Sequence, residues 1–85
     1  ALGEPQKAVE FYQQALAIDL AIYGEKHPNV ATSYNNLGEA WRALGEPQKA
    51  VDFFQQALAI FEMVYGPEHP STQTVRRNLE SIKNE

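Results

Sequence analysis

The chain has 85 residues, a net charge of −4 and 44% apolar residues, a composition typical of one small, ordered globular domain. It contains neither a run of about 18 apolar residues that could span a membrane nor a basic stripe of the kind that binds nucleic acid. Because there is no cysteine, disulfides and thiolate metal ligands are excluded. With no recognisable signal peptide either, we expect a cytoplasmic protein.

The chain repeats itself with an offset of 42 residues. Residues 1–9 recur unchanged as residues 43–51, and residues 13–18 recur as residues 55–60. A period between 20 and 50 residues is typical of a unit that buries its apolar face only by stacking on copies of itself. We therefore expect a single domain over residues 1–85, made of the copies 1–42 and 43–84. Since the chain begins inside a repeat and without methionine, we expect it to be part of a longer protein.

The first helix is predicted over residues 5–23. Pro5 suits a first helical turn, where its missing N–H is not needed. Gly24 suits the left-handed residue that follows a helix end.

The second helix is predicted over residues 28–44, between Pro28 and Gly45. Its apolar residues recur at helical spacing. Gly38 lies inside it, where glycine costs about 1 kcal/mol relative to alanine. We expect this glycine to allow close approach of a neighbouring helix.

The third helix, predicted over residues 47–65, repeats the first one and has apolar residues on two flanks. A helix of this kind is packed between neighbours on both sides. Its apolar residues are Ala50, Val51, Phe53, Phe54, Ala57, Leu58, Ile60, Phe61, Val64 and Tyr65.

The last helix, predicted over residues 70–84, breaks the repeat pattern. A polar outer face is what the terminal helix of a stacked array needs, so we expect a capping helix and a natural end of the array. Charged residues replace Tyr34, Gly38 and Trp41 of the second helix, namely Arg76, Glu80 and Lys83.

The second and third helices share a set of residues at fixed spacings, namely Tyr34, Leu37, Gly38, Trp41, Ala50, Phe54 and Ala57, and the first copy has Ala8, Tyr12 and Ala15 at the matching positions. This set resembles the signature of the tetratricopeptide repeat family. The resemblance implies an all-α fold in which antiparallel helix pairs stack into a right-handed superhelix, an α-solenoid with a concave groove that binds peptides. The usual 34-residue unit has a proline where this chain has Glu62, and the longer unit is similar to the 42-residue variety of kinesin light chains.

The polar flank of the second helix is the candidate binding surface, because the resemblance implies that it lines the concave groove. Glu39 would repel a carboxylate, so a ligand held by its terminal carboxylate is disfavoured. Asn36 is repeated as Asn78, and this pair is equally compatible with a structural bond between helices. The candidate peptide-binding residues are Thr32, Asn35, Asn36, Glu39, Arg42, Thr74, Arg77 and Ser81.

No residue pattern predicts catalysis, a cofactor or a metal site. No serine lies in a Gly-x-Ser-x-Gly setting. His27 and His69 recur in equivalent turns, but two ligands without cysteine or paired carboxylates make a poor zinc site, and a structural role is favoured. We expect a non-enzymatic module that binds a protein or peptide partner. The alternative is a structural unit that self-associates and has no ligand of its own.

The first helix lacks the preceding helix that should cover one of its flanks. Phe11, Ala15 and Ile18 on that flank are copied as Phe53, Ala57 and Ile60. Exposed apolar surface of this kind usually indicates association. We expect a homodimer through Phe11, Ala15 and Ile18, formed either symmetrically or by exchange of helices.

Overall fold

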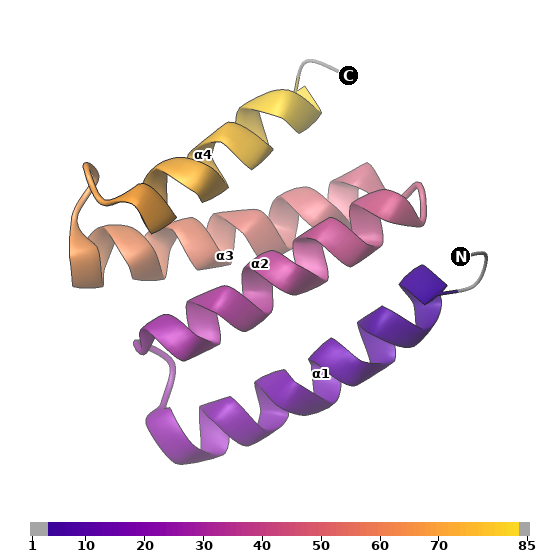
Figure 1. Ribbon diagram of the computed structural model, residues 1–85, viewed down its shortest axis with the longest axis horizontal. Helices are drawn as coiled ribbons and strands as arrows, with labels where there is room; N and C mark the ends of the chain where they lie inside the picture. The colour runs from indigo at the N-terminus through magenta and orange to yellow at the C-terminus, as the bar shows by residue number, and fades with distance from the viewer. Residues whose placement is uncertain (1–3, 84–85) are drawn as a thin grey trace.

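The protein is described here from a computed structural model that covers residues 4–83 (Figure 1). Over these residues it is formed by the helices α1 (Glu4–Tyr23), α2 (Pro28–Ala43), α3 (Pro47–Tyr65) and α4 (Pro70–Lys83), and no strand is present. The predicted all-α solenoid is confirmed. Two helix ends differ by one residue from the predicted bounds, and the predicted end at residue 84 lies outside the described residues.

Each helix packs on its neighbours in the chain. α2 lies between α1 and α3, and α3 lies between α2 and α4 (Figure 1). The short connections between them turn at Gly24, Gly45 and Gly66, whose φ angles are 81°, 79° and 88°. Because residues with a Cβ rarely adopt this left-handed conformation, glycine is the residue that ends the helices here.

The core consists of two connected clusters. The smaller one is formed by Val9, Leu37 and Ala40, and Trp41 packs against both clusters. The Lys49 ammonium lies 4.2 Å from the centre of the Trp41 ring, a favourable cation–π arrangement. The larger cluster joins α2, α3 and α4 through Val30, Ala31, Ala50, Phe54, Ala57, Ile60, Phe61, Val75, Leu79 and Ile82.

Gly38 has the close-packing role that the sequence predicted. A Cβ built on it would lie only 2.6 Å from Cε1 of Phe54, whose side chain is completely buried. Real Cβ atoms do not approach a ring carbon so closely. α2 and α3 therefore meet at a point where only glycine fits.

α4 has the two flanks expected of a capping helix. Val75, Leu79 and Ile82 are buried in the larger cluster, while Arg76 pairs with Glu62 of α3 at 3.0 Å in a solvent-exposed contact. Glu62 is the residue that stands in place of the usual proline. In this chain that position supplies the carboxylate that pairs with Arg76 on the polar flank of α4.

Candidate protein-interaction site

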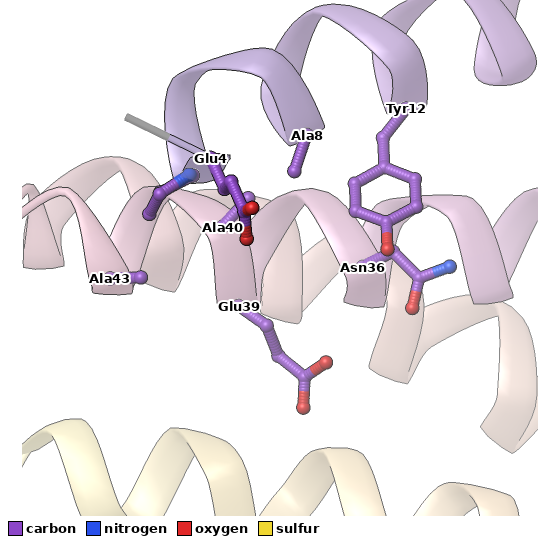
Figure 2. A pocket seen from close by; sticks show the side chains of 8 residues that line it. Glu4, Ala8, Tyr12, Asn36, Glu39, Ala40 and Ala43 are labelled. Atoms are coloured by element: carbon purple, nitrogen blue, oxygen red, sulfur yellow. The ribbon is translucent and has the colours of Figure 1, made fainter. Parts of the chain in front are cut away.

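A hollow of about 350 Å³ opens between the beginning of α1 and the end of α2 (Figure 2). Tyr12 reaches across from α1, so that its phenol oxygen lies beside Asn36, while Glu39 points away from α2 (Figure 2). The residues around this hollow are Glu4, Pro5, Ala8, Tyr12, Asn36, Glu39, Ala40 and Ala43.

The helix geometry explains this mixed lining. Asn36, Glu39 and Ala43 are three and four residues apart, and this spacing places them on one face of α2. Ala8 and Ala40 are small, so the two helices leave room between them. The result is a small apolar floor with an amide, a phenol and a carboxylate at its rim.

A second hollow, of about 630 Å³, lies next to the first around the end of α2. Both hollows are lined by Glu39 and Ala43, and the second also includes Arg42, Gly45 and Pro47. The open surface therefore continues from α1 around the end of α2 to the start of α3.

Two side-chain hydrogen bonds join α2 to α4 on the polar flank of α2. Asn78 Nδ2 donates to Asn35 Oδ1 at 3.1 Å, and Arg42 Nη2 donates to Ser81 Oγ at 2.8 Å. The bond between helices suggested for Asn36 and Asn78 is thus made by Asn35. Asn36 is about 100° further around α2, and it lines the hollow beside α1 instead.

The remaining candidates lie away from the two hollows. The hydroxyls of Thr32 and Thr74 donate to the carbonyls of Pro28 and Pro70 in their own helices. Arg77 Nη2 donates to Thr74 Oγ1 at 3.5 Å on α4. Of the eight predicted residues, the hollows bring together Asn36, Glu39 and Arg42.

The sequence analysis did not assign Tyr12 or Glu4 to the groove. Tyr12 packs against the smaller core cluster, and its ring also forms one side of the hollow. A signal was present in the repeat, because the residue equivalent to Tyr12 in the second copy is the fully buried Phe54. A hydroxyl gained at one copy of a core position indicates access to water.

Both histidines have a structural role in the turns. His27 Nδ1 accepts the N–H of Asn29 at 3.0 Å, and its ring stacks on Tyr23 with centroids 4.1 Å apart. His69 repeats this arrangement with Ser71 and Tyr65. Within residues 4–83, no group of three or more histidine, cysteine, aspartate or glutamate side chains is arranged to hold a metal ion.

Between residues 4 and 83, no helix is both long enough and apolar enough to cross a lipid bilayer.

The family comparison agrees with the fold and with the signature spacings. The tetratricopeptide repeat model matches residues 1–63, which is most of the chain, and the 42-residue unit fits the kinesin-light-chain-like variety. No curated protein is similar enough to count as a match. Repeats of this family are scaffolds for protein–protein interaction and are generally non-catalytic. From its helix pairs, its signature residues and this match, the chain belongs to the tetratricopeptide repeat family.

Proposed function

We propose that the chain is a non-enzymatic interaction module that binds a peptide segment of a partner protein along the groove face of α2. The groove face is defined by Tyr12, Asn36, Glu39 and Arg42. The observation that carries the proposal is the pair of adjoining hollows that share Glu39. Small apolar floors with a few polar groups at the rim are typical of sites that bind a ligand by shape and orient it by hydrogen bonds.

The chemistry of this face suits the backbone of an extended peptide. The Asn36 amide can both donate and accept a hydrogen bond, so it can pair with a peptide N–H and C=O. Tyr12 adds a flat apolar ring with a polar tip, a combination enriched at protein interfaces. Asn35 is less suited to this role, since its side-chain oxygen already accepts from Asn78.

The two hollows are lined by two carboxylates, Glu4 and Glu39, and one guanidinium, Arg42, and this balance favours a peptide with a basic side chain. The Glu39 carboxylate points away from the axis of α2 (Figure 2) and is exposed, and the whole chain carries a net charge of −4. A carboxylate attracts lysine or arginine and repels acidic groups. The alternative function, self-association without any ligand, is supported by a different surface, the exposed flank of α1.

The test is selection of peptides from a displayed random library on the immobilised 85-residue chain, followed by calorimetry of the selected sequences. We expect peptides that contain lysine or arginine, with affinity about tenfold weaker for Glu39→Gln and for Asn36→Ala. Gln55→Ala is the matched control, because Gln55 is an exposed amide on α3 that lines neither hollow. If no peptide is enriched, or if both groove variants bind a selected peptide as well as the control does, the proposal is wrong.

A further inference from the structure

Two turns of the stack, α1 to α2 and α3 to α4, share one residue pattern. Each follows a helix that ends in tyrosine, passes through a glycine with positive φ, and reaches a histidine just before the proline that begins the next helix. The turns are residues 23–28 and 65–70. The two positions between glycine and histidine differ between them, so tyrosine, glycine, histidine and proline are what the turns share.

In the first turn, His27 contacts both the helix before it and the helix after it. Its ring stacks on Tyr23 at the end of α1, with centroids 4.1 Å apart and planes at 19°. Its Nδ1 accepts the backbone N–H of Asn29 in the first turn of α2 at 3.0 Å. We call this arrangement, formed by Tyr23, His27 and Asn29, the first clasp.

The second clasp has the same geometry and is formed by Tyr65, His69 and Ser71. The rings of His69 and Tyr65 stack with centroids 4.0 Å apart and planes at 16°. Nδ1 of His69 accepts the N–H of Ser71 at 3.1 Å in the first turn of α4. Because two separate turns reproduce both contacts, the clasp is a property of the shared residues rather than of one local environment.

The hydrogen bond to Nδ1 exists only while the imidazole is neutral. A neutral imidazole has one nitrogen that accepts and one that donates, whereas a protonated imidazole donates from both. A second proton would place an N–H on Nδ1, facing the backbone N–H that it now accepts. Turning the ring over does not restore the bond, because the other nitrogen donates as well. Protonation therefore removes the cap at the start of α2 or α4.

The size of the effect follows from three contributions at each clasp. Loss of a cap typically raises the equilibrium constant for unfolding about fivefold. A positive charge at a helix N-terminus raises it by a further factor of about two to five. A charged imidazole on a tyrosine ring lowers it by a similar factor of about two to five through cation–π attraction. The last two nearly cancel, which leaves about fivefold for each clasp.

The charged groups around the first clasp do not offset this loss. Glu25 and Lys26 lie in the turn itself and carry opposite charges. The hollow that these two residues line is completed by uncharged side chains, among them Tyr34 of α2 and Met63 of α3. The ring that stacks on His27 belongs to Tyr23, which is uncharged at neutral pH.

Around the second clasp the nearby charges are also committed elsewhere or balanced. Glu68 precedes His69 in the turn. Arg76 of α4 donates to the carbonyl of Pro67 at 3.4 Å and pairs with Glu62 of α3 at 3.0 Å. Within the part of the chain that the structure describes, neither imidazole forms an ion pair with a carboxylate.

We propose that the two clasps are a pH-sensitive device that holds the starts of α2 and α4 above about pH 7 and loosens them as the pH falls toward 5. In an unfolded chain, histidine takes up its proton near pH 6.5. The folded chain loses two caps when it does so, so protons bind the unfolded chain preferentially and favour it. The stability that the clasps contribute is therefore complete above this pH range and is lost as the pH falls through it.

Urea unfolding of the 85-residue chain at pH 7.5 and pH 5.5, at constant ionic strength, tests the proposal. The two histidines are the only side chains of this chain that ordinarily titrate between these values. We expect the equilibrium constant for unfolding to rise about 20-fold at the lower pH. In the double variant His27→Asn with His69→Asn it should rise far less, because asparagine supplies an acceptor that does not titrate.

The matched control is the double variant Tyr23→Leu with Tyr65→Leu, which keeps both histidines and both caps. Without the aromatic ring there is no cation–π attraction for the protonated imidazole. The pH dependence should therefore become steeper than in the parent. A pH dependence that disappears in this control would assign the effect to the ring stack and overturn the role of the caps.

Two further results would overturn the proposal. One is an equal pH dependence in the parent and in the double asparagine variant. The other comes from nitrogen NMR of the parent at pH 7.5, which reports which imidazole nitrogen carries the proton. We expect it on Nε2 in both histidines, and a proton on Nδ1 would rule out the clasp without relying on any variant.

Discussion

Gly38 is the position at which a single missing side chain matters most for the packing of this protein. Alanine at this position should gain about 1 kcal/mol of helix propensity, but its Cβ would meet the Phe54 ring at 2.6 Å. Overpacking of a closed core typically costs about 1–3 kcal/mol. We therefore expect Gly38→Ala to lower the free energy of unfolding in urea, and Gly38→Leu to lower it further.

Replacing the Phe54 ring by a smaller side chain separates the packing cost at position 38 from the gain in helix propensity. In the Gly38→Ala background, Phe54→Leu should cost less than it does in the parent, because the two sites are in contact and their effects are coupled. A Gly38→Ala variant more stable than the parent by about 1 kcal/mol, the full gain in helix propensity, would show that the helices accommodate the added Cβ at no packing cost.

The histidine caps allow a second residue-scale prediction. His69 accepts the N–H of Ser71 at 3.1 Å at the start of α4, a bond that the side-chain oxygen of asparagine can replace. His69→Ala should cost about 1 kcal/mol of stability in thermal unfolding, and His69→Asn should cost less. If both variants are equally destabilised, the stacking on Tyr65 at 4.0 Å is the dominant contribution.

At the scale of the element, α4 shows which kind of contact holds a terminal helix. Leu79 is buried, so Leu79→Ala should lower the free energy of unfolding by about 2–5 kcal/mol. Arg76→Ala should cost less than about 1 kcal/mol, because the side chains of Arg76 and Glu62 are 36% and 44% exposed. Urea unfolding followed by circular dichroism compares the two variants. Similar losses would mean that the ion pair contributes as much as apolar burial.

At the scale of the whole molecule, the stack predicts a gradient of local stability. α2 and α3 each pack between two neighbours, whereas α1 and α4 each have one. In stacked repeats, stability is approximately a sum of unit and nearest-neighbour terms, so opening begins at the ends. Native-state hydrogen exchange should find the slowest amides in α2 and α3. Equal protection in all four helices would indicate a fully cooperative unit instead.

Much of the fold follows from the sequence because its signals are local. Proline in a first turn and glycine after a last turn set the helix bounds to within a residue, as at Pro28 and Gly24, and the 42-residue period gives the stacking order. The exposure of Phe11 and Ile18 within the described residues was also predictable, because their copies Phe53 and Ile60 follow the second helix in the sequence, whereas no such helix precedes them in the 85 residues.

The tertiary structure alone decided which polar side chains meet. Whether Asn35 or Asn36 pairs with Asn78 depends on the rotation of α2 about its axis, and one residue changes the direction of a side chain by about 100°. Whether the ring of Tyr12, which packs against the smaller core cluster, is also open to the groove depends on how far apart the small residues Ala8 and Ala40 allow α1 and α2 to sit. Helical periodicity determines the apolar flank of each helix, but the distance and rotation between two packed helices result from all their contacts together.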